Sequence, residues 1–311
     1  MNEQQDVLVV GTGYLGKRVA QIAHQLGYRV FTTTRRPERL DELKRAGFHP
    51  ILLDWNDSRT FSESTSHRRE GFASIEQAFS PHLRVLVAVS YDSRGRLGRY
   101  ESQVLGFRRL LHWLPPDSRV AYVSTTGVYH QTGGVWVDER SPTHPSREAA
   151  AVHLQAEQQL HRTRPSGKYL ILRLAGIYGP ERIPRIADVA AGTPVQTNPS
   201  TYLNLIHVDD AAQACVNSWD YMDAEQNEGA SIQRRLFLVA DNMPVQRGDF
   251  YNEIARQTHS PKPNFVPPSA NASPRRRGET DKRICSRKMR RLILPSLRYP
   301  DFRQGLVSAL Q

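Results

Sequence analysis

The sequence predicts an α/β fold built on a doubly wound parallel sheet. Short β-branched runs alternate with amphipathic stretches through the first half of the chain, which is the pattern of parallel βαβ units. Runs such as VLVV and RVLVAVS are almost wholly apolar, which is typical of strands covered by helices on both faces. The 311 residues leave room beyond such a sheet for a second, smaller lobe.

The elements follow in order from this alternation. A polar stretch at 57–73 predicts a loop or a poorly ordered insertion, and beyond Gly179 the pattern becomes less regular. There we expect a helix at 209–220, a strand at 236–240 and a helix at 246–258. The expected strands of the first half are Val7–Val10, Arg29–Thr33, Pro50–Asp54, Arg84–Ser90, Arg119–Ser124 and Tyr169–Leu174, with helices near residues 14–27, 37–46, 74–80, 100–113 and 146–162.

A glycine motif of the form GxGxxG lies between the first strand and the first helix. Its first glycine permits a tight turn, its second lets the backbone approach a pyrophosphate, and its third allows close packing of helix on strand. The helix N-terminus then offers unpaired N–H groups to the phosphates. This context predicts a Rossmann-type dinucleotide site. The motif consists of Gly11, Thr12, Gly13, Tyr14, Leu15 and Gly16.

The end of the second strand indicates which dinucleotide binds. It carries no Asp or Glu of the kind that a strict NAD binder places on the ribose 2′-hydroxyl, and the first acid is Glu38. Arg35 and Arg36 can instead bind a 2′-phosphate through their guanidinium forks. NADP is therefore favoured over NAD. The alternative is an exposed helix N-terminus that happens to be rich in arginine.

Two further strand ends are expected beside the cofactor. Asp54, which ends the third strand, is placed to accept a hydrogen bond from the adenine amino group, although it could equally cap a loop. Val89 and Ser90 end the fourth strand. Ligands of open α/β sheets bind outside the carboxyl ends of the strands, so we include all three residues in the cofactor site.

Three more segments carry a resemblance to a known family. Together with the glycine motif, VSTTGVY (123–129), LRLAGIYGP (172–180) and LIHVDDAA (205–212) resemble the extended short-chain dehydrogenase/reductase superfamily, in its NAD(P)-dependent epimerase/dehydratase group. The resemblance covers nearly the whole chain. It is strongest to an atypical, YeeZ-like branch whose glycine loop also has the form GxGxxG, and it implies a Rossmann fold that binds NAD(P).

The family's catalytic machinery is only partly matched. In the family a Tyr moves a proton, a Lys lowers its pKa and holds the ribose, and a Ser or Thr orients the substrate oxygen. Thr125 matches the Ser/Thr position. Alignment on Glu157 puts Ala149 at the Tyr position and His153 at the Lys position, and none of the 12 tyrosines is followed four residues later by a lysine. The YxxxK pair is therefore absent.

Other groups would then have to move the proton. Tyr129 and Tyr178 follow family motifs near the cofactor cleft, and His153 could titrate near neutral pH. With Thr125 they are the candidate catalytic residues. Each also has a structural alternative: the two tyrosines as packing residues with satisfied hydroxyls, and His153 as a polar residue on a helix.

The resemblance and the charge pattern suggest two regions. We expect an NAD(P)-binding domain at 1–180 and a smaller substrate-binding lobe at 181–311, interleaved with the end of the sheet. Residues 261–311 hold 12 Lys and Arg against 3 Asp and Glu, whereas the whole chain has a net charge of +11. This basic segment, with Arg275–Arg277, could bind a polyanion or a phosphate-bearing ligand. A solvated basic face is favoured, because no aromatic residue lies among its charges between 269 and 298.

Several classes of protein find no support. No apolar stretch approaches the roughly 20 residues of a membrane span, and the first residues do not resemble a secretion signal, so we expect a cytoplasmic protein without membrane contact. Cys215 and Cys285 lie outside any CxxC motif, which argues against disulfide frameworks and zinc sites. HExxH, GxSxG and GK[ST] motifs of metalloenzymes, hydrolases and P-loop proteins are absent.

Three functions remain open. The first is an NADP-dependent oxidoreductase or epimerase/dehydratase with a non-standard acid–base group. It would act on a hydroxyl or carbonyl group of a small molecule, for which a nucleotide sugar is one candidate. The second is a protein that holds NADP(H) without turnover and reports redox state. The third, placed last, is a nucleic-acid-associated protein that uses the basic tail. The resemblance also makes a homodimer a reasonable expectation.

Overall fold

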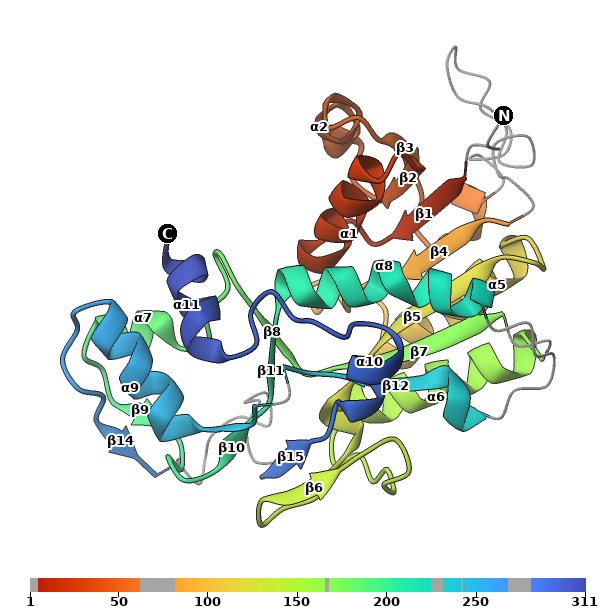
Figure 1. The fold of residues 1–311 in the computed structure, drawn as a ribbon. Coiled ribbons are helices and arrows are strands. Elements are labelled where there is room, and N and C mark those ends of the chain that lie inside the picture. The colour runs from red at the N-terminus through yellow and green to blue at the C-terminus, as the bar shows by residue number, and fades with distance from the viewer. Residues whose placement is uncertain (1–4, 62–81, 166–167, 225–231, 242, 268–280) are drawn as a thin grey trace. The chain divides into compact units, whose positions relative to one another are not determined.

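A seven-stranded sheet in the order β12-β7-β5-β4-β1-β2-β3 forms the centre of the computed structural model (Figure 1). The pairs β1–β2, β2–β3, β1–β4 and β4–β5 are all parallel. The structure describes residues 5–61, 82–165, 168–224, 232–241, 243–267 and 281–311. The strands of the sheet are β1 (Asp6–Val10), β2 (Arg29–Thr34), β3 (His49–Leu52), β4 (Arg84–Val87), β5 (Arg119–Thr125), β7 (Tyr169–Leu174) and β12 (Leu236–Val239).

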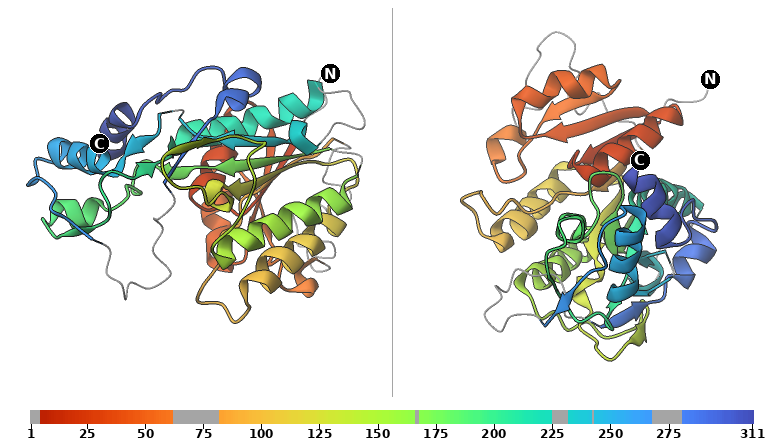
Figure 2. Two further views of the ribbon diagram at one scale, coloured as in Figure 1. Left: turned by 90° about the horizontal axis from the view of Figure 1, so that it is seen from below. Right: turned by 90° about the vertical axis from the view of Figure 1, so that its left-hand side faces the viewer.

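Helices cover both faces of this sheet, which confirms the doubly wound fold. Leu8 and Val10 of β1 pack in one buried cluster with Phe107, whereas a Cβ atom on Gly16 would lie 3.1 Å from Val9 on the opposite face. In the left view of Figure 2, α5 and α6 lie on one side of the sheet and α8 on the other. The helices are α1 (Tyr14–Gln25), α2 (Leu40–Arg45), α5 (Gly106–Trp113), α6 (Glu148–Thr163) and α8 (Val208–Ala224), with a 3-10 turn η1 (Pro37–Arg39) before α2 and a π-helical turn η2 (Glu101–Leu105) before α5.

Some expectations about the elements are wrong in detail. The third strand ends at Leu52 rather than at Asp54, and the fourth strand ends at Val87 rather than at Ser90, because the residues that follow each strand line a pocket. Residues 58–61 are helical where a loop was expected, because the Asp57 carboxylate accepts the backbone N–H of Arg59 at 3.0 Å and so caps the turn. The helix expected at 74–80 and the arginines 275–277 lie outside the described residues.

The chain divides into two compact units, each assembled from three segments. The first unit comprises residues 1–125, 146–173 and 212–237, and the second comprises residues 126–145, 174–211 and 238–311. The first unit therefore holds most of the sheet. The described residues include no helix that is both long enough and apolar enough to cross a bilayer.

The second unit is built from short strand pairs and small helices around its own core. Tyr178, Phe250, Phe302 and Leu306 are fully or almost fully buried there. The strand pairs are β8–β11 and β9–β14, both parallel, β6–β15, also parallel, and β10–β13, which is antiparallel. The elements are β6 (Val135–Val137), β8 (Gly176–Tyr178), α7 (Ile186–Ala190), β9 (Val195–Gln196), β10 (Tyr202–Leu203), β11 (Leu205–His207), β13 (Val245–Gln246), α9 (Arg247–Gln257), β14 (Phe265–Val266), β15 (Lys282–Ile284), α10 (Arg287–Leu292) and α11 (Phe302–Leu310). A 3-10 turn, η4 (Ile232–Arg235), belongs to the first unit and directly precedes β12.

Candidate active site

A pocket of about 510 Å³ lies at the carboxyl ends of four neighbouring strands of the first unit. Its walls include residues 11–13 after β1, 33–36 at the end of β2, 53–56 after β3 and 88–92 after β4. Strand β1 lies between β2 and β4, so the order of the strands reverses beside it. Such a switch point is where open α/β sheets bind their ligands.

The glycines of the loop have different physical roles. Gly11 adopts φ +94°, and a Cβ atom on it would lie 2.7 Å from the Ala88 carbonyl oxygen. A Cβ atom on Gly16 would overlap the Gly11 carbonyl oxygen. Gly13 differs from both, because a Cβ atom there would meet nothing within 4 Å. Packing thus requires glycine at 11 and 16, while Gly13 leaves space in the pocket that a ligand can fill.

Hydrogen bonds fasten the loop to β2. The Gly11 N–H donates to the Thr33 hydroxyl at 3.1 Å, and the Thr12 hydroxyl donates to the Thr33 carbonyl oxygen at 3.0 Å. No side chain caps the N-terminus of α1, and its first turn holds no acidic residue. The first-turn amides and the positive end of the helix dipole are therefore suited to an anion.

The structure brings most of the expected cofactor residues together. Tyr14, Leu15 and Gly16 do not line the pocket, and Leu15 and Gly16 are buried as α1 packs on the sheet. The expected residues that do line it are Gly11, Thr12, Gly13, Arg35, Arg36, Asp54, Val89 and Ser90. Asp54 also caps its own turn, since its carboxylate accepts the Asn56 N–H at 3.0 Å. Both of the alternatives considered for Asp54 are thus compatible with its geometry.

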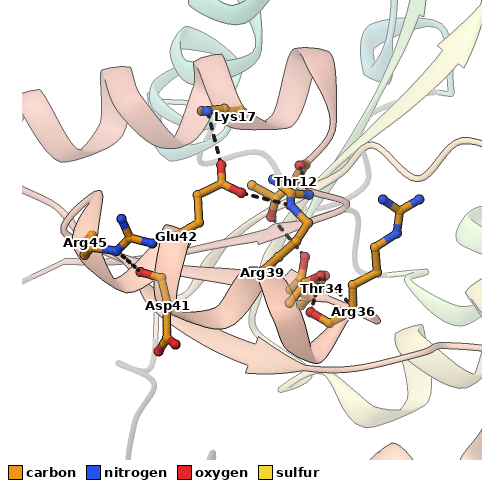
Figure 3. Close-up of polar contacts among 9 residues, drawn as sticks. Thr12, Lys17, Thr34, Arg36, Arg39, Asp41, Glu42 and Arg45 are labelled. Carbon is orange, nitrogen blue, oxygen red and sulfur yellow. Dashed lines mark hydrogen bonds and ion pairs between the residues drawn. The ribbon is translucent and has the colours of Figure 1, made fainter.

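Arg35 and Arg36 differ in their partners. Arg35 forms an ion pair with Asp92, which lies after β4. The hydrogen bond from the Arg94 N–H, followed by the contact with Arg35, lowers the pKa of Asp92 below its usual range. Arg36 is exposed, and among the described residues its guanidinium has no ion pair or hydrogen bond (Figure 3). One arginine is therefore neutralised and the other is available.

Sequence reasoning missed a third arginine at this wall. Arg39 donates to the Thr12 carbonyl oxygen at 3.0 Å and contacts Glu42 at 3.4 Å, and Glu42 also contacts Lys17 at 3.3 Å (Figure 3). Arg39 and then Lys17 lower the pKa of Glu42. These side-chain contacts link the glycine loop to α2. The spacing of Arg36 and Arg39, one helical turn apart, was the signal that could have identified it.

A second cluster of polar side chains lies between β5 and α6. Glu157, at the centre, forms an ion pair with Arg173 at 2.6 Å and accepts the Ser124 hydroxyl at 2.6 Å, and all three residues are buried. Thr125 ends β5 and is half-buried. Ala149, which the resemblance aligns with the family's tyrosine, has an apolar side chain and offers no proton. The cluster itself consists of buried polar groups that pair with one another.

His153 makes a hydrogen bond that fixes its chemical form. Its Nδ1 lies 2.9 Å from the hydroxyl of Tyr122, which is 3% exposed and stacks on Phe107. Burial raises the pKa of Tyr122 and lowers the pKa of His153, so both groups are neutral near pH 7. A buried phenol hydroxyl needs an acceptor, and Nδ1 is the acceptor within reach. We therefore assign to His153 the neutral tautomer with its proton on Nε2, which leaves Nδ1 to accept from Tyr122.

The two candidate tyrosines belong to the interior of the second unit. Tyr129 and Tyr178 both have 0% exposure. The Tyr178 ring packs edge-on against His207 and Phe250, with centroid distances of 5.4 and 6.4 Å. Burial raises the pKa of Tyr178, which makes proton release harder. None of Thr125, Tyr129, His153 and Tyr178 lines the 510 Å³ pocket.

Comparisons with known proteins agree with this architecture. A model of the NAD dependent epimerase/dehydratase family matches residues 7–230. A functionally unknown conserved protein from Silicibacter pomeroyi is 25% identical, with a TM-score of 0.73 over 99% of this chain and 98% of that one. A search of curated proteins finds no match.

Two solved enzymes share the fold at lower identity. dTDP-glucose 4,6-dehydratase from Bacillus anthracis, solved in complex with NAD, is 15% identical, with a TM-score of 0.73 over 99% of this chain and 96% of that one. The UDP-Glc/GlcNAc 4-epimerase from Campylobacter jejuni is 17% identical, with a TM-score of 0.74 over 98% of each chain. These likenesses show that the sheet and its flanking helices form a Rossmann-type fold.

Proposed function

The chain belongs to the NAD dependent epimerase/dehydratase family, and from that premise we propose that it binds NADP(H) in the 510 Å³ pocket and uses it on a hydroxyl or carbonyl group of a small molecule. The observation that carries the proposal is one juxtaposition. An uncapped helix N-terminus and the open space over Gly13 lie beside a strand end that has arginines and no acid. A nicotinamide dinucleotide is the cofactor class of the family.

The residues present fit such a cofactor. The loop around Gly13 would hold the pyrophosphate on the N–H groups that begin α1, and Asp54 would face the adenine. Arg36 would bind the 2′-phosphate that distinguishes NADP from NAD, because its guanidinium has no other partner in the part of the chain that the structure describes. When bound, the nicotinamide ring supplies or accepts a hydride.

For the substrate we propose only a chemical class. Related solved structures are named for dTDP-glucose and UDP-sugar chemistry, which supports a nucleotide sugar as the first class to test. Thr125, at the end of β5, would orient the reacting oxygen, and the neutral ring of His153 would donate a hydrogen bond to that oxygen from Nε2–H. The full burial of Tyr129 and Tyr178 favours packing roles for both.

One observation favours a second function. The resemblance puts Ala149 at the position of the family's proton-transferring tyrosine, and burial lowers the pKa of His153, which keeps its ring neutral near pH 7. A protein that binds NADP(H) and reports its redox state without turnover needs neither a tyrosine nor a cationic lysine. This alternative predicts cofactor affinity without substrate-dependent change in the absorbance of the reduced nicotinamide.

Calorimetric titration with NADPH and NADH tests the binding proposal, and a panel of sugar nucleotides and simple carbonyl compounds then separates the two functions. We expect NADPH to bind more tightly than NADH.

If turnover is found, Thr125→Ala should lower the rate of turnover and leave the cofactor affinity unchanged, whereas Thr163→Ala, at the far end of α6, should change neither quantity. Absence of binding by both nucleotides would contradict the proposal, and turnover unaffected by Thr125→Ala would remove the role assigned to that residue.

A further inference from the structure

The ion pair between Arg35 and Asp92 joins two walls of the pocket. Arg35 follows β2 and Asp92 follows β4, and both residues line the pocket. Their side chains remain 43% and 30% exposed, so the pair lies within reach of solvent and of a ligand. Asp92 is also held in place by the Arg94 N–H at 3.0 Å. The carboxylate thus occupies a fixed position against the guanidinium.

The charge of the pocket is suited to a doubly negative group. Its lining contains four arginines and two aspartates, a surplus of two positive charges. A phosphate monoester carries about −1.5 to −2 charges at pH 7. The charged residues that line the pocket are Arg35, Arg36, Arg39, Arg96, Asp54 and Asp92.

The three arginines after β2 are not equally available to such a group. Arg39 is engaged by Glu42 and by the Thr12 carbonyl oxygen, so it holds the glycine loop (Figure 3). Arg36 is unpaired among the described residues. Arg35 already has the carboxylate of Asp92, and any phosphate that binds it must first displace that carboxylate.

We propose that the Arg35–Asp92 ion pair is an exchangeable clasp, in which Asp92 occupies the guanidinium that a 2′-phosphate would take and thereby limits the preference for NADP(H). The inference deepens the proposed function and rests on it. An exposed ion pair in water is weak, whereas a phosphate offers more charge and a fork of oxygens to the same guanidinium. Replacement of the Asp92 carboxylate by the phosphate is therefore favourable. Breaking the ion pair, however, cancels part of the binding free energy that Arg35 contributes. Asp92 is in this sense a specificity-determining residue.

The first test removes the competing charge and keeps the shape. Asp92→Asn retains an oxygen for the Arg94 N–H. It should tighten binding of adenosine 2′,5′-bisphosphate and of NADPH by about two- to fivefold, which is the range for one ion pair at an exposed site. Binding of adenosine 5′-monophosphate and NADH should not change. Asp117→Asn is the matched control, because it also removes an aspartate from an ion pair of this unit, with Lys168, outside the pocket.

The second test asks whether Asp92 acts through Arg35. If it does, Arg35→Ala should weaken bisphosphate binding only slightly in the natural chain, where the guanidinium is already neutralised. In the Asp92→Asn background the same change should weaken it several-fold more, since the freed guanidinium is then lost. Equal effects in the two backgrounds would show that Asp92 acts by simple repulsion and would overturn the clasp.

The outcomes separate this inference from the proposed function. Unchanged or weaker bisphosphate affinity in Asp92→Asn overturns the clasp, while tight NADPH binding by the natural chain would still support the cofactor proposal. Failure of the natural chain to bind both the bisphosphate and NADPH overturns both. Thermal unfolding of each variant establishes that the compared proteins are folded.

Discussion

The pocket at the ends of β1 to β4 and the β5–α6 cluster differ in what carries their chemistry. In the pocket the groups that we propose to bind the cofactor belong to the backbone: the turn at Gly11, the open space at Gly13 and the uncapped amides of α1. In the cluster the essential groups would be side chains, and there Ala149 has no proton to exchange. A binding site made of backbone tolerates sequence change around it, whereas a catalytic group is lost by one substitution.

The β5–α6 cluster has nevertheless kept its buried polar frame. Glu157 retains Arg173 and Ser124, and His153 retains Tyr122, all within the first unit. Buried polar groups are costly unless they are paired, so removal of a reactive side chain leaves this frame under the same constraint. The comparison therefore separates three roles: binding of a ligand by backbone groups in the pocket, pairing of buried polar side chains in the cluster, and proton transfer.

The largest expected effect concerns the structural frame. Arg173→Met leaves the Glu157 carboxylate buried without its partner, and the free energy of unfolding should fall by roughly 3–5 kcal/mol. Denaturant unfolding measures this loss. Arg256→Met, which breaks an exposed ion pair with Glu253, should leave the unfolding midpoint nearly unchanged. Similar stability of both variants would show that the cluster is not a structural frame.

The next effect concerns backbone binding. Gly13→Val puts a branched side chain into the space over the loop, and the affinity for both NADPH and NADH should fall by about a hundredfold, or roughly 2.7 kcal/mol. Among the described residues, apart from the two chain neighbours, no atom lies within 4 Å of the new Cβ position, so the thermal midpoint should change little. Gln25→Val, at the exposed end of α1, is the control. Retained affinity in Gly13→Val would remove the glycine loop from the site.

A smaller effect concerns the choice between NADP and NAD. Arg36→Ala removes an unpartnered guanidinium, and NADPH affinity should fall by about tenfold while NADH affinity stays constant. Arg45→Ala, on the neighbouring helix α2 and outside the pocket lining, should change neither (Figure 3). A ratio of affinities that does not change in Arg36→Ala would show that its guanidinium does not bind the 2′-phosphate.

The smallest effect concerns the histidine of the β5–α6 cluster. Tyr122→Phe removes the donor to Nδ1 of His153, which stabilises the neutral ring, so the pKa of His153 should rise by up to about one unit. Burial lowers the pKa of His153 in the folded chain below its value in the unfolded chain. The free energy of unfolding should therefore decrease as the pH falls from the pKa of the unfolded chain to that of the folded chain, because only the unfolded chain takes up the proton in this range. Nitrogen NMR of the imidazole follows both the tautomer and the titration.

Tyr169→Phe provides the matched control for this experiment. Its hydroxyl makes the same kind of hydrogen bond to Nδ1 of His161, two turns further along α6. That variant should alter the titration of His161 and leave His153 unchanged. A His153 that carries its proton on Nδ1 in the natural chain would contradict the assigned tautomer.

Much of the fold and the loop could be predicted from local pattern. The apolar runs that became β1, β5 and β7 and the spacing of Gly11, Gly13 and Gly16 are properties of contiguous sequence, because strand period and turn geometry act over a few residues. Asp92 could not have been found in this way. It lies 57 residues from Arg35, and only the parallel pairing of β2, β1 and β4 brings the ends of those strands together.

The sequence by itself predicted the class of fold and the glycine loop, and it shows that no tyrosine is followed four residues later by a lysine, since each depends on which residues follow one another. The tertiary structure decided which arginine is free, which is neutralised and which holds the loop. It also decided that His153 is neutral and that Tyr129 and Tyr178 are buried. The physical reason is that the charge state and exposure of a side chain depend on the neighbours that folding brings to it, and these are distant in the chain.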